Sequence, residues 1–313
     1  MTTAFIFPGQ GSQSKGMLGD IGSAYPVIGD TFAEAADVLG YDLWAVCQHD
    51  ADESLSRTEV TQPALLTASI ALWRAWLAAG GPQPAVLAGH SLGEYSALVC
   101  AGSLTLADAV ALVRRRGELM QQAVPAGSGA MAAILGLDDD VVIAACDAVS
   151  DGVVSAANFN APGQVVIAGE TAAVDTAIAH CKEGGARRAL PLPVSVPSHC
   201  ALMQPAADAF AADLANVTIN APSIPVVNNV DVQVEADSQA IRDALIRQLY
   251  SPVQWSATIR HMVTDGVETF VECGSGKVLS GLLKRIHKPA ASMALETPDG
   301  FSGALAALTT GES

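Results

Sequence analysis

The segment Gly89-His90-Ser91-Leu92-Gly93 matches the G-x-S-x-G pattern, which places a nucleophilic serine on a sharp turn between a strand and a helix. Glycines are needed there because a Cβ at either flanking position would clash with the neighbouring strand and helix. An apolar run over 85–88 precedes the pattern and a helical pattern over 92–101 follows it, as the motif requires. Ser91 is therefore predicted to be a nucleophile, with a tight structural turn as the alternative.

A serine hydroxyl needs a base, and the chain has six histidines. His90 adjoins Ser91 on the predicted turn, so its side chain should point away from the hydroxyl. His199 is expected to open a helix, where the positive potential of the helix N-terminus would keep its imidazole neutral and able to accept a proton. His199 is the candidate base, with a structural cap as the alternative. The other four histidines are expected to be solvated: His49, His180, His261 and His287.

Arg116 is the residue that best indicates the chemistry of the substrate. On a predicted helix over 106–120, a projection at 100° per residue places Arg116 in the middle of the apolar stripe, while Arg114 and Arg115 point away. A buried guanidinium without a partner is very costly, so Arg116 must meet an anion. That anion is either an Asp or Glu of the protein or a carboxylate that arrives with the substrate.

A glycine-rich loop over 8–13 follows the first predicted strand. It fails the dinucleotide-binding pattern because Ser14 stands where a third glycine is required, and the segment 274–276 fails in the same way at Leu279. In enzymes with a nucleophilic elbow, one oxyanion donor follows the nucleophile and another comes from such a loop. The backbone amides of Leu92 and Gln10 are the candidates, and a purely structural turn is the alternative.

Around these residues, short apolar runs alternate with longer amphipathic stretches, which favours a parallel α/β sheet covered on both faces. These predicted strands are 4–7, 85–88, 224–227 and 269–271. The segment 125–197 instead follows the order β-α-β-β-α-β, which is typical of a ferredoxin-like domain. Its predicted elements are strands 130–135, 153–157, 164–168 and 187–194, helices from 138 and over 170–182, and a turn over 160–163. We predict a large domain over 1–124 and 198–313 that carries this insert.

Half of the 313 residues are hydrophobic and 15% are charged, so a packed core is expected instead of disorder. A formal net charge of −16 would repel phosphate backbones and anionic lipids, which argues against nucleic-acid and membrane partners. The six cysteines lack zinc-ligand spacing, which indicates reduced thiols. With no basic N-terminal region visible, we expect a cytoplasmic protein, and a monomer.

Together these residues resemble the malonyl-CoA:acyl carrier protein transacylase family of stand-alone enzymes in fatty-acid synthesis. The resemblance runs from Phe5 to Leu308. It rests on the segments FPGQGSQ (7–13), TQPALL (61–66), GHSLGEYSALVCAG (89–102), NFNAPGQVVIAG (158–169), LPVSVPSH (192–199), VVNNVD (226–231), QLYSPVQW (248–255) and GSGKVLSGL (274–282). It implies an α/β-hydrolase-like core with a ferredoxin-like insert, in agreement with the segmentation above.

By position, the resemblance implies that Ser91 is the nucleophile, His199 the base and Arg116 the group that binds the malonyl carboxylate. It also implies that the amides of Gln10 and Leu92 form the oxyanion hole and that the main-chain carbonyl of Gln248 orients the histidine. The segment 274–276 reads Gly-Ser-Gly where many relatives have Gly-Pro-Gly, which is expected to loosen this loop. Three polar residues in matched segments are left without a role: Gln62, Asn158 and Asn160.

The implied activity is transfer of malonyl from malonyl-CoA to the phosphopantetheine thiol of acyl carrier protein through a malonyl-serine, without a bound cofactor or metal. The alternatives are a transacylase subunit of a malonate decarboxylase complex, a serine thioesterase or esterase, and a non-catalytic carrier-binding module. Because carrier proteins are acidic, a basic docking patch is expected despite the net charge, with a solvated face as the alternative. The candidate patch is Lys277, Lys284, Arg285 and Lys288, and a second cluster is Lys182, Arg187 and Arg188.

Overall fold

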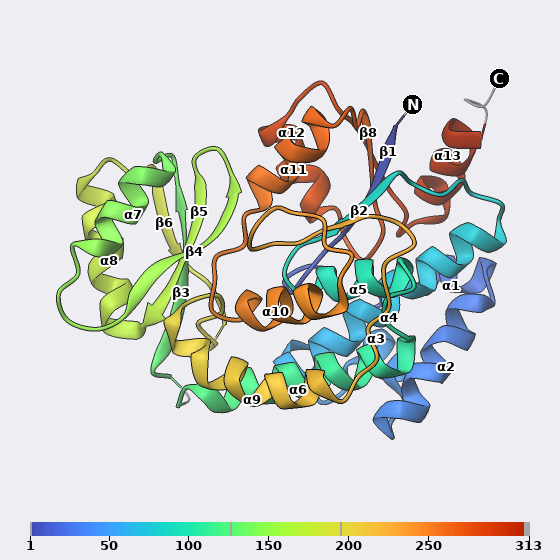
Figure 1. Cartoon of the computed structure of the whole chain (residues 1–313), viewed down its shortest axis with the longest axis horizontal. Helices are drawn as coiled ribbons and strands as arrows, with labels where there is room; N and C mark the ends of the chain where they lie inside the picture. The colour runs from blue at the N-terminus through green and yellow to red at the C-terminus, as the bar shows by residue number, and fades with distance from the viewer. Residues whose placement is uncertain (1, 126, 195, 310–313) are drawn as a thin grey trace.

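The computed structural model describes residues 2–125, 127–194 and 196–309. Two separate sheets make up its framework (Figure 1). The larger one is entirely parallel, with the strand order β7-β2-β1-β8-β9. Its strands are β1 (Thr3–Phe7), β2 (Val86–Gly89), β7 (Val226–Val227), β8 (Thr269–Glu272) and β9 (Ala291–Ala294). The predicted parallel α/β core is therefore confirmed.

Side chains of β1 alternate between two hydrophobic clusters, one on each face of this sheet. Phe5 and Phe7 belong to the larger cluster. Its helices are α1 (Gly19–Ala24), α2 (Val27–Leu39), α3 (Leu43–His49), α4 (Thr58–Ala78), α5 (Gly93–Cys100), α6 (Leu106–Ala123), α9 (Gln204–Ala215), α10 (Ser238–Gln248) and α13 (Pro298–Thr309). Ala4 and Ile6 pack in the smaller cluster. Its helices are α11 (Trp255–Thr264) and α12 (Val278–Ile286).

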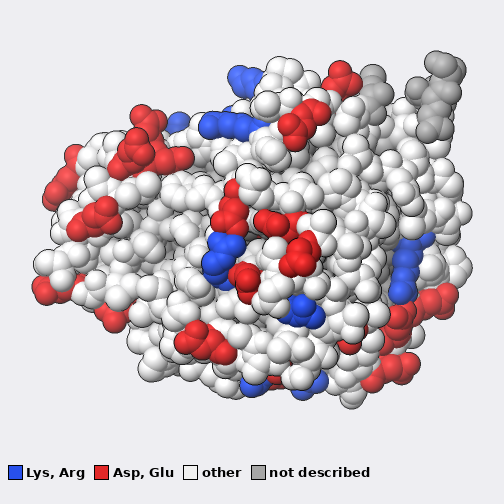
Figure 2. Space-filling view, in the orientation of Figure 1, with Lys and Arg blue, Asp and Glu red and all other residues white. Residues whose placement is uncertain are grey.

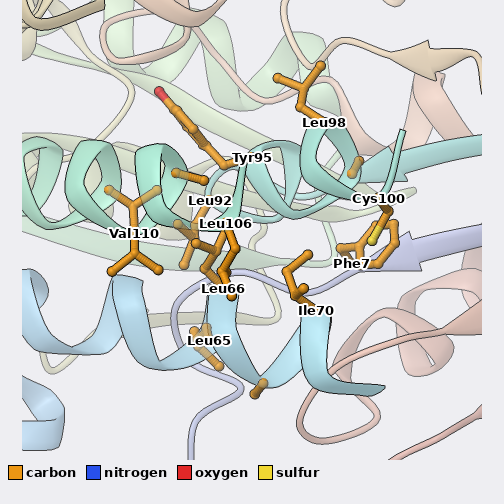
Figure 3. Packing of buried hydrophobic residues seen from close by; sticks show 14 of the residues in the cluster. Phe7, Leu65, Leu66, Ile70, Leu92, Tyr95, Leu98, Cys100, Leu106 and Val110 are labelled. Atoms are coloured by element: carbon orange, nitrogen blue, oxygen red, sulfur yellow. The ribbon is translucent and has the colours of Figure 1, made fainter. Parts of the chain in front are cut away.

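Helices α4, α5 and α6 form the layer that carries the candidate residues, and many of the buried side chains between them are apolar. Figure 3 shows Leu66 and Ile70 of α4 directed toward Phe7, Leu92 and Leu106. All five side chains are buried, so the turn after β2 and the start of α6 rest on one closely packed surface. No helix within the described ranges is long and apolar enough to cross a bilayer.

The smaller sheet is antiparallel, with the order β4-β5-β3-β6. Its strands are β3 (Gly129–Leu135), β4 (Val154–Ala161), β5 (Gln164–Glu170) and β6 (Arg188–Pro191), and its helices are α7 (Asp139–Asp147) and α8 (Thr171–Glu183). Buried residues of both helices pack on one face of the sheet. This chain order and strand order are those of the ferredoxin-like arrangement, as predicted.

The predicted insert 125–197 encloses all six of these elements, and its exact limits stay a prediction. Met1, Ala126, Ser195 and residues 310–313 fall within the predicted domain ranges but lie outside the described residues.

Several elements differ from the sequence-based expectation. Strand β6 ends at Pro191 instead of residue 194, and β7 begins at Val226 instead of residue 224. Strand β4 continues through Ala161 into the predicted turn 160–163, because it also bonds to the large domain: Phe159 N donates to Val253 O at 2.9 Å, and Val253 N donates to Ala157 O at 2.9 Å. Strand β9 was not predicted at all. Its sequence ASMA has a weak apolar pattern, and it forms the edge of the parallel sheet beside β8.

Glu272 fixes the start of α12 relative to the parallel sheet. It ends β8 fully buried, and its two carboxylate oxygens accept from Leu279 N at 3.0 Å and from Ser280 N at 2.8 Å. A carboxylate at this point satisfies amides that the helix itself leaves unpaired. Glu272 thus joins the carboxyl end of β8 to the first turn of α12.

We expect Glu272→Gln to lower the free energy of unfolding by about 1–3 kcal/mol, because an amide can accept only one of the two bonds and brings a donor toward a backbone N–H. Urea unfolding followed by circular dichroism measures this change. Glu268→Gln, at an exposed position just before β8, serves as the control and should stay within about 0.5 kcal/mol of the wild type. Equal stability of the two variants would contradict this account of Glu272.

Candidate active site

Ser91 lies on the turn between β2 and α5 with a backbone φ of 51°. This is the left-handed region, which a non-glycine residue occupies only under strain. A Cβ on Gly89 would overlap the backbone of Gly93, and a Cβ on Gly93 would overlap the carbonyl of Phe7 on β1. The two glycines of the motif are therefore required by close backbone approach, as the sequence suggested.

Asn229 holds this strained turn in place, and sequence reasoning missed it. Its side-chain Oδ1 accepts from Ser91 N at 2.6 Å, and its Nδ2 donates to Gly89 O at 2.6 Å. The residue is fully buried just after β7, the strand next to β2. The one signal in the sequence was its place in a segment shared with the resembled family, which says nothing about this contact.

His199 is placed to act on the serine. Ser91 Oγ lies 2.8 Å from His199 Nε2, and His199 Nδ1 lies 2.7 Å from the main-chain oxygen of Gln248. Because a carbonyl oxygen can only accept, Nδ1 carries the proton and Nε2 is free to accept one from the hydroxyl. Ser91, His199 and the carbonyl of Gln248 are thus connected by two successive hydrogen bonds.

The prediction that His199 opens a helix was wrong. A 3₁₀ turn begins at Ala201 and α9 only at Gln204, while His199 itself has a φ of 65°. Burial, together with the nearby Arg116 cation, lowers the pKa of His199 to about 3. The imidazole is neutral as expected, but desolvation keeps it so instead of a helix terminus.

Arg116 is fully buried on α6 and lies beside the nucleophile. Its Nη2 donates to Ser91 Oγ at 3.3 Å and to Gln248 Oε1 at 3.0 Å, and its Nη1 donates to Gln62 Oε1 at 2.9 Å. The guanidinium carbon also lies 5.6 Å from the centre of the Tyr95 ring. No Asp or Glu among the described residues forms an ion pair with Arg116, which contradicts the alternative of a structural acid in direct contact with it.

The two neighbouring arginines differ from Arg116 in the way the helix projection predicted. Arg114 forms an ion pair with Glu118, and Arg115 pairs with Glu118 and Asp213. Their side chains are 43% and 42% exposed. Of these three arginines, only Arg116 is buried, and only Arg116 has no carboxylate in contact.

The two amides proposed for an oxyanion hole come from different loops at the same site. Gln10 lies in the exposed loop after β1, and Leu92 is buried directly after Ser91. Neither backbone N–H has an acceptor among the residues that the structure describes. Both are therefore available to a ligand, and the oxyanion role stays a prediction.

Ser275 does not loosen its loop, contrary to expectation. The residue is fully buried, and its Oγ lies 3.0 Å from Ser12 O and 2.9 Å from Glu296 Oε1. Glu296 Oε2 also accepts from Gly276 N at 2.9 Å. The hydroxyl thus links this loop to the loop that carries Gln10, an interaction that the proline found in many relatives could not supply.

A cleft of about 1030 Å³ lies between the two sheets and opens onto Ser91. Its lining includes the residues Pro8, Gly9, Gln10, Gly11, His90, Ser91, Met131, Asn158, Asn160, Gln164, Val166, Leu192, Ser198, His199, Leu279 and Leu282. Asn160 Oδ1 lies 2.8 Å from His90 Nε2, so His90 is directed away from the hydroxyl as predicted. Within the described part of the chain, no group of three or more His, Cys, Asp or Glu is placed to hold a metal ion.

The four cations of the candidate docking patch are exposed on or beside α12. Basic side chains lie at the upper edge of the view in Figure 2, in the region where Figure 1 draws α12, with acidic side chains beside them; most of this face is uncharged, with charged groups of both signs scattered over it. Arg285 differs from the lysines because its Nη1 donates to Gln164 Oε1 of β5 at 2.7 Å. It therefore also connects α12 to the smaller sheet.

We expect Asn229→Ala to slow acylation of Ser91 at least about tenfold and to lower the free energy of unfolding by about 1–3 kcal/mol, because Ser91 N and Gly89 O both lose their partner. Rapid-quench kinetics and urea unfolding measure the two effects. Asn220→Ala, at an exposed site, is the control. A variant with wild-type rate and stability would show that the turn does not need Asn229.

Comparison with known proteins agrees with this geometry. The family model described as "Acyl transferase domain" matches residues 4–297. The malonyl CoA-acyl carrier protein transacylase of Escherichia coli (strain K12) is 60% identical over 303 residues, which cover 96% of this chain and 98% of that protein. The protein of the same name from Bacillus subtilis (strain 168) is 44% identical over 307 residues, covering 97% and 96%.

Solved structures are similar over the same length. A malonyl-transacylase in complex with the holo acyl carrier protein of a type II PKS superposes with a TM-score of 0.97 at 54% identity, covering 98% of this chain and all of that one. An acyl carrier protein S-malonyltransferase from Vibrio cholerae gives a TM-score of 0.95 at 58% identity, covering 97% and 99%. The chain belongs to the acyl transferase family, among the malonyl CoA-acyl carrier protein transacylases.

Proposed function

We propose that the protein transfers the malonyl group from malonyl-CoA to the phosphopantetheine thiol of an acyl carrier protein, through an ester on Ser91. One observation carries the choice of substrate: the guanidinium of Arg116 is buried with neutral partners 3.3 Å from the attacking oxygen. An acyl chain that ends in a carboxylate would supply the missing anion while its thioester carbon meets Ser91 Oγ. The names of the relatives point to the same activity.

The first half-reaction forms the ester. His199 Nε2 accepts the hydroxyl proton as Ser91 Oγ attacks the thioester carbon, and the amides of Gln10 and Leu92 stabilise the negative oxygen that results. The carbon–sulfur bond then breaks, and His199 returns the proton to the departing sulfur. Coenzyme A leaves as the thiol, with the malonyl group on Ser91.

The second half-reaction reverses these steps with a new thiol. The phosphopantetheine thiol gives its proton to His199 and attacks the ester carbon, the bond to Ser91 Oγ breaks, and His199 reprotonates the serine. The reaction balances with the groups of the chain alone, so we propose that no resident cofactor takes part. The unpaired, buried cysteines fit a cytoplasmic location.

Arg116 also accounts for selectivity. Acetyl-CoA has no carboxylate, so it would leave the buried cation facing an uncharged methyl group in the space that the substrate occupies. Malonyl-CoA replaces that unfavourable contact by a charge-assisted pair. The preference therefore arises from the cost of the wrong substrate as well as from attraction to the right one.

Mass spectrometry after mixing with malonyl-CoA tests the proposal: a malonyl adduct on Ser91 should form and should be absent in Ser91→Ala. Arg116→Ala should slow acylation by malonyl-CoA about 100-fold and remove the preference over acetyl-CoA, because the carboxylate loses a charged partner. Arg115→Ala, its exposed neighbour, is the matched control. Rapid loss of the adduct to water would favour a thioesterase, and an unchanged preference in Arg116→Ala would overturn the role of Arg116.

The docking patch on α12 is tested by the Michaelis constant for carrier protein. Lys284→Glu should raise it severalfold at low salt and leave that for malonyl-CoA unchanged, because like charges then meet at the interface. Lys284 is preferred to Arg285 for this test because Arg285 also bonds to Gln164. The same charge reversal at Lys182, in the second basic cluster, serves as the comparison. An effect at Lys182 and none at Lys284 would place the carrier elsewhere.

A further inference from the structure

Glu94 is a buried carboxylate beneath the active site that the mechanism above does not use. It lies in the first turn of α5, only 3% exposed. A single oxygen, Oε2, accepts from Gln248 Nε2 at 2.8 Å and from Asn229 N at 3.0 Å. Within the described ranges, no Lys or Arg forms an ion pair with it. Burying a charge of this kind costs free energy, so the hydrogen-bond partners of Glu94 indicate its role.

Gln248 stands between this carboxylate and Arg116. Its side-chain Oε1 accepts from Arg116 Nη2 at 3.0 Å, and its Nε2 donates to Glu94 Oε2 and, at 3.2 Å, to Ser91 O. An ionised carboxylate can only accept and a guanidinium can only donate. The amide between them therefore has one allowed orientation, which Arg116, Glu94 and the carbonyl of Ser91 all favour.

The second contact of Glu94 leads to the nucleophile. The amide of Asn229 donates to the carboxylate, while the Asn229 side chain bonds Ser91 N and Gly89 O. The residue that receives the first contact, Gln248, also supplies the carbonyl that orients His199. Glu94 is thus one residue away from the nucleophile, the base and the carboxylate-binding arginine.

We propose that Glu94 is a positioning residue that serves as a counter-charge for Arg116 through the side chain of Gln248. The intervening amide matters because a carboxylate in direct contact would occupy the place of the substrate. With one amide between them, Glu94 partly offsets the charge of Arg116 and no carboxylate of the protein occupies the place of the malonyl carboxylate. This inference rests on the proposed function and adds a requirement for the charge of Glu94.

The electrostatic surroundings give this charge a measurable signature. Burial raises the pKa of Glu94 to about 7; Arg116 on α6 opposes the rise, and Asp231, beyond β7 and bonded to Arg247, adds to it. Glu235 lines the same small cavity of about 10 Å³ as Glu94. A protonated Glu94 carries no negative charge, so it no longer acts as a counter-charge for Arg116. The working form is the ionised one, which prevails above about pH 7.

The test measures single-turnover acylation of Ser91 by malonyl-CoA and by acetyl-CoA from about pH 5.5 to 9. In the wild type, the malonyl rate should fall on the acid side with an apparent pKa near 7, which we call the acid limb. Burial and the nearby Arg116 lower the pKa of His199, so we expect this limb to report Glu94 and test it with the variants below. Glu94→Gln keeps the shape and an acceptor but removes the charge. It should lack this limb and be about tenfold slower with malonyl-CoA at about pH 8, with a smaller effect on acetyl-CoA.

Two further variants keep the test decisive. Glu235→Gln removes a carboxylate from the same cavity without touching Gln248 or Asn229, and it should keep both rate and limb. Gln248→Leu retains the main-chain carbonyl for His199 but deletes the bridge, so it should also lose the limb. The double variant with Glu94→Gln and Gln248→Leu should acylate Ser91 no more slowly than Gln248→Leu alone. Gln248→Leu carries the test alone if thermal melting shows that Glu94→Gln does not fold.

The outcomes separate this inference from the proposed function. A wild type that forms no malonyl adduct would refute the function itself. A wild type that forms the adduct, with Glu94→Gln showing the same rate and the same acid limb, would refute only the role of Glu94. Additive losses in Glu94→Gln and Gln248→Leu would likewise show that the two residues do not act through one another.

Discussion

The site depends on a guanidinium kept in the interior of the protein without a carboxylate in contact. Two glutamine amides, Gln62 and Gln248, and the ring of Tyr95 surround Arg116, and these groups orient a cation without neutralising it. Desolvation makes such an arrangement costly. In the function proposed above, the same cost is the source of selectivity, because a ligand that brings a negative charge to this place relieves it.

One residue, Gln248, joins the functions of this site. Its main chain fixes the tautomer of His199, and its side chain fixes the orientation of Arg116. His199 and Arg116 are therefore coupled through one residue, which in the proposed mechanism keeps the reacting carbon and the proton acceptor in register. Because both are buried, their electrostatic interactions are also stronger than they would be in water.

Much of this could be predicted from the sequence, for physical reasons that differ among the elements. The alternation of apolar runs identified the parallel sheet and the ferredoxin-like order, and the helical projection of 106–120 placed Arg116 inside. Local patterns carry such information because backbone periodicity decides which side chains are buried. The turn at Ser91 could also be predicted from a local pattern, because close approach of the backbone requires its two glycines.

What could not be predicted involves contacts between distant segments. Asn229 reaches the turn at Ser91, and Glu94 reaches Gln248, across large separations along the chain. No local pattern encodes such pairs. The neutral state of His199 was expected for the wrong cause, since burial by tertiary packing, not a helix terminus, produces it. Ser275 was similarly misjudged, because its partners Ser12 and Glu296 come from other loops.

Strand β4 forms hydrogen bonds both to β5 and to the segment around Val253. It therefore connects the two walls of the cleft at one end. A wide hinge motion of the smaller sheet would have to break the bonds of Phe159 and Ala157 to Val253. A cleft whose two walls are joined in this way suits a long, slender arm such as the proposed phosphopantetheine, and it would limit the access of water to the ester between the two half-reactions.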